Sequence, residues 1–187
     1  VSFDNGRRYL DQEKIQSALD KATVFGAEYA EVRLVSITDS SVSTRDGQLE
    51  RAIPGQEVGA TMRILADGAW GVHSTTDISS IPLQVEGTVK LARAVASRRG
   101  IKDKPVSLAE VPIIEDSIHW NPKKDVRNTE LSEKLEHLKV LHDNSSDDSK
   151  IASVICGWHD EHIHTEFMSS EGMNRVWSFQ RSLVNAT

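Results

Sequence analysis

The sequence predicts an α+β fold in which antiparallel or mixed β-meander sheets pack against about three helices. Residues 27–76 alternate polar and apolar side chains and are interrupted by Asp46-Gly47 and Asp67-Gly68, pairs typical of two-residue hairpin turns. Three other segments repeat apolar residues every three or four positions, which indicates amphipathic helices. A second alternating region begins near Lys150.

Composition limits the classes of function. The 187 residues are enough for one good core or two small ones. A formal net charge of −6 and the lack of a long Lys/Arg run argue against a surface that grips phosphates, so no direct nucleic-acid partner is expected. The single Cys156 excludes an internal disulfide, and no segment resembles a signal peptide or a membrane span. We therefore expect a cytoplasmic protein with no membrane partner.

The first elements are a helix and a meander. A helix is predicted over residues 11–25, with Asp11 as its N-cap and Gly26 after its last turn. In the strands that follow, alternate residues face one core: Ala30, Val32 and Leu34 in the first, and Val58, Ala60, Met62 and Ile64 in the second. Gly59 and Gly71 indicate bulges or a close approach of another backbone.

A second helix is predicted over residues 81–97, capped by Ser79 or Ser80, with Pro82 in its first turn. Residues 101–125 are expected to form an extended connection. A third helix is predicted over residues 130–142, capped by Asn128 or Thr129.

The remaining residues predict three strands, 150–158, 159–170 and 173–187, with a turn at Glu171-Gly172. The expected organisation is a helix–meander–helix subdomain (1–100), the connection (101–125), and a helix with strands (126–187). The last strand has no closing turn or cap, so we expect the chain to be truncated.

Histidines are the main candidates for a metal site. His162 and His164 are two residues apart and share a face of a strand, and His159 lies nearby. Solvated histidines on a polar strand are the more common explanation of such a cluster. The pattern nevertheless keeps open a small, independent metal-binding protein.

No other catalytic group is predicted. His73 and Ser74 are adjacent on a strand, so they face opposite sides and do not form a base–nucleophile pair. Cys156 alternates with apolar residues and reads as a core residue. Glycines form no phosphate-binding loop. We therefore assign no catalytic, cofactor-binding or metal residue to this chain.

Four segments carry a resemblance to a known family: GAEYAEVRL, STRDGQLE, GATMRILADGAWGVHSTTD and FMSSEG. Together they resemble the N-terminal half of the TldD/PmbA family, whose members are also called modulators of DNA gyrase. The most specific part is Gly68-Ala69-Trp70-Gly71 followed by Ser74-Thr75, and it is more similar to the TldD branch than to the PmbA (TldE) branch.

The resemblance implies a zinc metalloprotease whose His-Glu-x-x-x-His motif lies in a C-terminal half, so no cofactor is expected in this chain. It also implies a peptide or unfolded-protein substrate, and a TldE-type partner subunit or a homodimer. This chain would form substrate-chamber walls and part of the subunit interface, and a peptide would add to an exposed sheet edge. The alternative is a protein-interaction module without enzymatic activity that modulates a DNA-gyrase-related complex.

Overall fold

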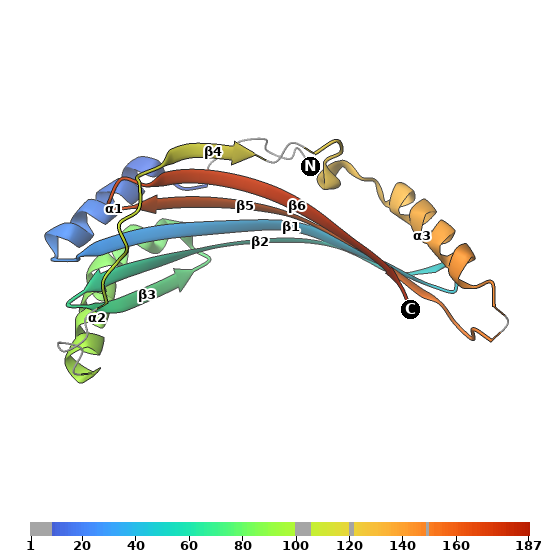
Figure 1. The fold of residues 1–187 in the computed structure, drawn as a ribbon, viewed down its shortest axis with the longest axis horizontal. Coiled ribbons are helices and arrows are strands. Elements are labelled where there is room, and N and C mark those ends of the chain that lie inside the picture. The colour runs from blue at the N-terminus through green and yellow to red at the C-terminus, as the bar shows by residue number, and fades with distance from the viewer. Residues whose placement is uncertain (1–8, 100–105, 120–121, 149) are drawn as a thin grey trace.

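The computed structural model describes residues 9–99, 106–119, 122–148 and 150–187. Within these residues six strands form one sheet in the order β3-β2-β1-β5-β6-β4 (Figure 1). The strands are β1 (Tyr29–Arg45), β2 (Gln48–Ala66), β3 (Ala69–Thr75), β4 (Glu115–His119), β5 (Ile155–Ser169) and β6 (Asn174–Ala186). The helices are α1 (Gln12–Val24), α2 (Val85–Arg99) and α3 (Leu131–Ser145), with 3₁₀ turns η1 (Ile78–Leu83) and η3 (Val126–Asn128).

Strand β1 lies at the centre of the sheet and joins its two halves. It pairs antiparallel with β2 from Tyr29 to Arg45 and with β5 from Glu31 to Arg45. The parallel pair is β4 with β6. The predicted α+β class is confirmed, but the meander and the C-terminal strands make one mixed sheet instead of separate ones.

The helices cover only one face of this sheet, which we call the helical face. Its β1 residues are the even-numbered ones, such as Ala30, Val32 and Leu34, and all three are completely buried. At one end of the sheet α1, η1 and α2 pack on this face and build the larger core (Figure 1). Its strand residues are Ala30, Val32, Leu34, Ala60, Met62, Ile64, Ala66 and Met168.

Helix α3 lies at the other end of the sheet (Figure 1). There a smaller core contains Val42, Leu138, Val154 and Cys156. Between the two cores the helical face is polar, with Ser36, Thr38 and Ser40 at successive positions along β1. The two cores therefore lie on the same face of one continuous sheet, at opposite ends of it.

The local signals at the turns are confirmed. Asp46 and Gly47 have φ values of 49° and 74°, and Asp67 and Gly68 have 51° and 72°. Positive φ at both central residues is the geometry of a type I′ turn, whose twist suits the flanking strands. The predicted first helix is also confirmed, because the Asp11 side chain accepts a hydrogen bond from Lys14 N and Gly26 has φ 83°.

The predicted start of the second helix is wrong. Asp77, instead of Ser79 or Ser80, caps this region: its carboxylate accepts hydrogen bonds from the Ser79 backbone N–H and hydroxyl. Pro82 lies inside η1, and α2 begins only at Val85. A short 3₁₀ turn satisfies these backbone groups before the α-helix begins.

Three other boundaries differ from the prediction. Residues 101–125 contain β4, whose five residues pair with the start of β6. Helix α3 begins at Leu131 with Glu130 at its N-cap, because Asn128 ends η3 and Thr129 is its C-cap. The predicted break between Trp158 and His159 does not occur. Residues 155–169 are one strand, because β1 offers an unbroken partner along that whole length.

Gly71 permits α2 to lie directly on β3. A Cβ atom at this position would come within 2.2 Å of Thr88 O, a backbone atom of α2. We predict that Gly71→Ala lowers the free energy of unfolding by about 1–3 kcal/mol through overpacking. Gly87→Ala is the matched control, because its Cβ meets nothing within 4 Å; as an exposed helix position it should gain about 1 kcal/mol. Urea unfolding of both variants tests this, and equal stabilities would contradict it.

Candidate functional site

The three clustered histidines of β5 do not converge. His162 and His164 lie on the helical face, but His159 lies on the opposite face, because strand side chains alternate. His159 Nδ1 is 2.9 Å from Ser41 Oγ and its Nε2 is 3.0 Å from Glu161 Oε1. His164 Nε2 is 3.2 Å from Glu166 Oε1. Among the described residues no group of three His, Cys, Asp or Glu side chains is placed to hold a metal ion.

Two buried carboxylates on β5 hold other segments to the sheet. Glu166 is 1% exposed and accepts hydrogen bonds from the backbone N–H groups of Tyr9 and Leu10, which fixes the entry into α1. Asp160 Oδ2 lies 2.6 Å from Lys134 Nζ on α3, with both side chains almost fully buried. Ser40 accepts a hydrogen bond from Lys134, and Ser182 donates one to Asp160. These groups have structural partners.

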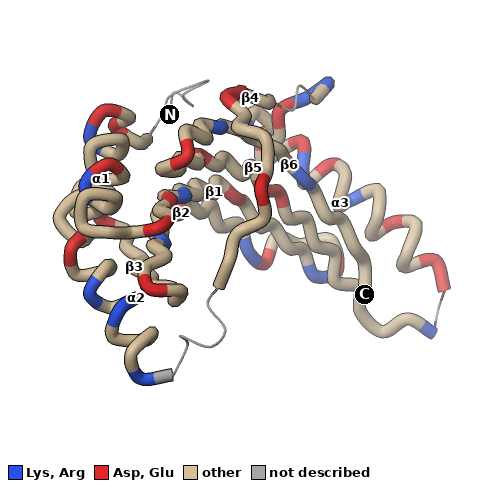
Figure 2. The backbone as a smooth tube through the Cα atoms, turned by 60° about the vertical axis from the view of Figure 1, so that its left-hand side comes forward, with Lys and Arg blue, Asp and Glu red and all other residues tan. Residues whose placement is uncertain are grey.

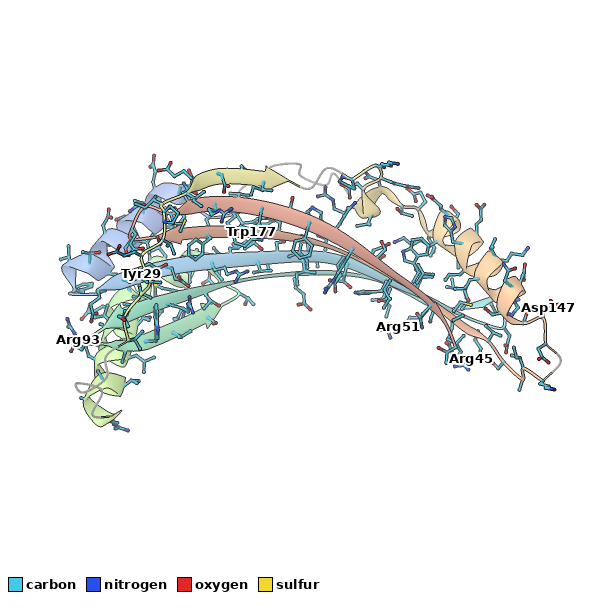
Figure 3. All side chains as sticks on the ribbon, in the orientation of Figure 1. Tyr29, Arg45, Arg51, Arg93, Asp147 and Trp177 are labelled. Carbon is cyan, nitrogen blue, oxygen red and sulfur yellow. The ribbon has the colours of Figure 1, made fainter. Side chains whose placement is uncertain are left out.

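The second face of the sheet, which we call the open face, carries no described helix. It consists of the odd-numbered residues of β1, β5 and β6 and their neighbours on β2. An apolar belt crosses its middle, formed by Val35, Ile37, Ile163, Phe167, Trp177 and Phe179. Tyr29 and Trp177 lie toward the end beside α1 and α2, and Arg45 and Arg51 lie toward the end near α3 (Figure 3).

All cationic strand residues are arginines on this open face, and the six strands contain no lysine. The arginines are Arg33, Arg45, Arg51, Arg63, Arg175 and Arg181. The described lysines lie instead on the helices and connections. In these parts Lys and Arg, both blue in Figure 2, are interspersed with acidic residues. Arg is favoured over Lys at protein interfaces because its planar guanidinium is weakly hydrated and stacks on aromatic rings.

Most of these arginines are held in place. Arg33 lies 5.5 Å from the centre of the Trp177 ring, and Arg63 lies 5.0 Å from that of Trp70. Arg63 also pairs with Glu31, which raises the pKa of its guanidinium. Burial, then the hydrogen bond to Glu31, raises the pKa of Tyr29. These contacts orient aromatic rings and cations on the open face.

Glu161 and Arg181 form another fixed pair at the far side of the belt. Arg181 Nε donates to Glu161 Oε2 at 2.5 Å, and this bond, with a smaller effect of His159, lowers the pKa of Glu161. Because Arg181 is 66% exposed, the pair adds little stability and serves to position the charges.

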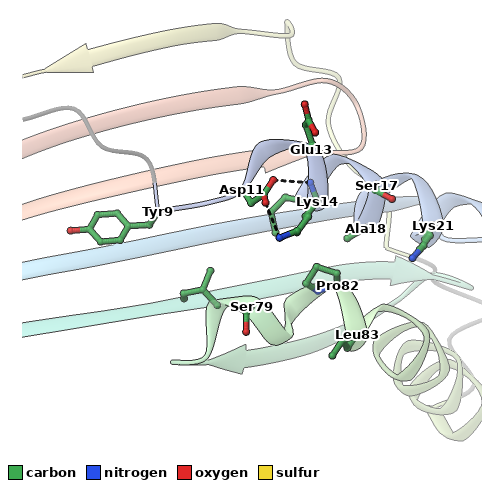
Figure 4. A pocket seen from close by; sticks show the side chains of 12 residues that line it. Tyr9, Asp11, Glu13, Lys14, Ser17, Ala18, Lys21, Ser79, Pro82 and Leu83 are labelled. Atoms are coloured by element: carbon green, nitrogen blue, oxygen red, sulfur yellow. Dashed lines mark hydrogen bonds and ion pairs between the residues drawn. The ribbon is translucent and has the colours of Figure 1, made fainter. Parts of the chain in front are cut away.

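A groove of about 690 Å³ lies between α1 and η1 on the outside of the larger core (Figure 4). Lys14 and Lys21 of α1 line one side, and Pro82 and Leu83 line the other. Lys14 is paired with Asp11 at 3.0 Å. No buried polar group of the described residues points into the groove to orient a ligand.

The other candidate residues from the sequence, Ser74, His73 and Cys156, form no catalytic pair. Ser74 Oγ lies 3.0 Å from Thr61 Oγ1 on the open face, whereas His73 faces the other side. Cys156 is completely buried in the smaller core, as predicted, and burial raises the pKa of its thiol.

In the part of the chain that the structure describes, no helix combines the length and apolar character needed to cross a membrane.

The described part of the chain is therefore an α+β domain, with an open sheet that carries its helices on one face and an aromatic–arginine surface on the other. Residues 30–97 match the family model described as PmbA/TldA metallopeptidase domain 1. This match over residues 30–97 agrees with the resemblance to the TldD/PmbA family drawn from the sequence motifs.

Two curated relatives are metalloproteases. One, from Methanocaldococcus jannaschii, is 24% identical over 164 residues that cover 87% of this chain and 35% of the relative. The other, from Methanothermobacter thermautotrophicus, is 27% identical over 146 residues that cover 78% of this chain and 30% of the relative. The chain thus spans about a third of the length of these relatives.

Solved structures share the fold. A protein from Thermotoga maritima, described as a "putative modulator of a DNA gyrase", superimposes with a TM-score of 0.72 at 14% identity, over 94% of this chain and 39% of that one. One from Bacteroides thetaiotaomicron with a similar description gives 0.68 at 19% identity, over 96% and 41%. TldE from Thermococcus kodakarensis gives 0.57 at 16% identity, over 92% and 39%.

Sequence reasoning missed the open face and the Lys134–Asp160 pair. Their signals were present: arginine replaces lysine throughout the strands, and Asp160 occupies an alternate position in line with Cys156. The aromatic belt is recognised only when β5 and β6 are aligned with β1, since no single strand carries more than a few of its members.

Cys156 should be unreactive in the folded protein. Its side chain is inaccessible and burial disfavours the thiolate, which is the reacting species. We predict no modification by a thiol-specific dye at pH 8 under native conditions and full modification in denaturant. Rapid stoichiometric modification of the native chain would show that α3 does not cover this core.

Lys134 should contribute to stability through Asp160. Lys134→Met leaves a buried carboxylate without its partner, and we expect a loss of about 3 kcal/mol in the free energy of unfolding. The double variant Lys134→Met/Asp160→Leu removes both charges and should recover most of that loss. Chemical denaturation of the unchanged chain and the two variants gives the comparison, and a double variant no more stable than Lys134→Met would contradict a coupled pair.

Proposed function

We propose that this chain is the non-catalytic N-terminal portion of a PmbA/TldD-type zinc metalloprotease. In this role it forms a wall of the substrate chamber and part of the subunit interface. The observation that carries the proposal is the match of residues 30–97 to the first domain of this metallopeptidase family. The metalloprotease relatives, about three times as long as their matched parts, support a division of labour between this domain and others.

The open face supports the architectural part of the proposal. Apolar belts rimmed by arginines and aromatic rings are typical of surfaces that other protein segments cover. Here the arginines are already oriented by Glu31, Glu161, Trp70 and Trp177, so covering them would cost little conformational entropy. Such a surface suits a fixed wall.

In this proposal the residues that bind the catalytic zinc lie in a part of the parent protein other than the described residues. A bound zinc polarises a peptide carbonyl and activates water for attack. The substrate class proposed is a peptide or an unfolded protein, and the proposed partner is a TldE-type subunit or a second copy. The shared fold of TldE from Thermococcus kodakarensis supports a partner of that type.

Three observations test the catalytic assignment. The coding sequence after Thr187 should encode a His-Glu-x-x-x-His motif. The 187-residue chain alone should hydrolyse no quenched fluorescent peptide and retain far less than one zinc per chain by elemental analysis. Hydrolysis by this chain, or stoichiometric zinc that depends on His162 and His164, would overturn the proposal.

The wall role is tested in the parent enzyme by charge reversal on the open face. Arg33→Glu should lower peptide cleavage at least tenfold with unchanged zinc content, because it places a carboxylate in the apolar belt. Lys139→Glu on the exposed side of α3 is the matched control and should keep normal activity. Equal activity of both variants would exclude the open face from the chamber and its interfaces.

A further inference from the structure

One edge of the sheet is left unpaired and unprotected. Strand β6 pairs with β5 from Asn174 to Ala186, but β4 covers its outer side only from Asn174 to Ser178. The segment before α3 lies beside β6 at Gln180. The Gln180 side chain accepts a hydrogen bond from Val126 N and donates one to Lys124 O. Residues 182–186 have no strand on their outer side among the described residues.

The hydrogen-bond pattern shows which groups point outward. Ile155 and Thr187 exchange both main-chain hydrogen bonds, and Ser169 N donates to Met173 O. In an antiparallel pair these bonds fall on alternate residues, so the odd-numbered residues of β6 bond to β5. Ser182, Val184 and Ala186 therefore direct their N–H and C=O groups away from the sheet.

The other long free edge is protected against pairing. Beyond the end of β3, the outer side of β2 from Gln48 to Gly59 is also uncovered. That stretch contains Glu50, Arg51, Pro54, Gly55 and Glu57, the residue types that block strand addition. Residues 182–186 (Ser-Leu-Val-Asn-Ala) contain no charge, proline or glycine. Within them Leu183 is 64% exposed and Val184 is 43% exposed.

We propose that residues 182–184 pair antiparallel with the same residues of a second copy of this chain, extending the sheet across a twofold axis at Leu183. In this register the two Leu183 side chains meet on the open face, and Ser182 of each copy bonds to Val184 of the other. Arg181 lies opposite Asn185, so no like charges face each other. The uncharged, self-complementary edge is the reason that the partner is a second copy.

This pairing rests on the proposed function, because it specifies the subunit interface of the wall domain. Four main-chain hydrogen bonds and a pair of leucines make a small contact, so the isolated chain should dimerise with a Kd on the order of 10 µM. The exchange is isologous, as closed dimers require.

Sedimentation velocity of the 187-residue chain from about 5 to about 500 µM measures this equilibrium. Leu183→Lys places two ammonium groups on the twofold axis and should weaken dimerisation at least tenfold. Leu49→Lys changes another exposed leucine, 49% accessible, on the protected β2 edge and should leave dimerisation unchanged. Circular dichroism checks that both variants keep the fold.

A second variant tests the register. Leu183→Cys should form an intermolecular disulfide on mild oxidation, whereas Leu49→Cys should not, and the native Cys156 is buried in both. A chain that stays monomeric at every concentration, or a dimer insensitive to Leu183→Lys, would overturn the proposal. So would a monomer that binds an extended peptide at this edge. Because the readout is association, it is independent of whether the parent cleaves peptides.

Discussion

The pairing of β1 with β5 holds the two ends of this domain together. Strand β1 is hydrogen-bonded on both edges along nearly its whole length, by β2 on one side and β5 on the other. The larger core with α1 and α2 and the smaller core with α3 lie at opposite ends of it (Figure 1). Polar residues occupy the helical face between them, so the backbone ladder itself connects the cores.

Among the described residues, this arrangement leaves one face of the sheet without helices. An antiparallel sheet with one face solvated is ordinarily polar on that side. Here the solvated side instead carries the apolar belt and arginines fixed by carboxylates and aromatic rings. The contrast supports a surface made for other protein segments.

Local elements were predictable because their signals lie within a few residues. The Asp-Gly turns, the Asp11 cap and the alternation of β1 and β2 are all of this kind, and the α+β class follows from them. Longer-range features were not predictable. The continuity of β5 depends on its partner β1, and β4 becomes a strand only because the start of β6 offers it an edge.

The candidate site shows the same limit. The histidine pattern placed His162 and His164 correctly on one face, but the contacts of His164 with Glu166 and Tyr9 required the packed structure. The Lys134–Asp160 pair joins residues from a helix and a strand that no sequence spacing links. The predicted subdomain boundaries stay predictions.

Native-state hydrogen exchange along β1 tests this account most directly. If one ladder unites both cores, the amides from Val35 to Ser41 should be as protected as those near Val32 and Val42, and all should exchange through a single global unfolding. Fast exchange of the central amides, with separate unfolding free energies for the two ends, would show two independent units and contradict it.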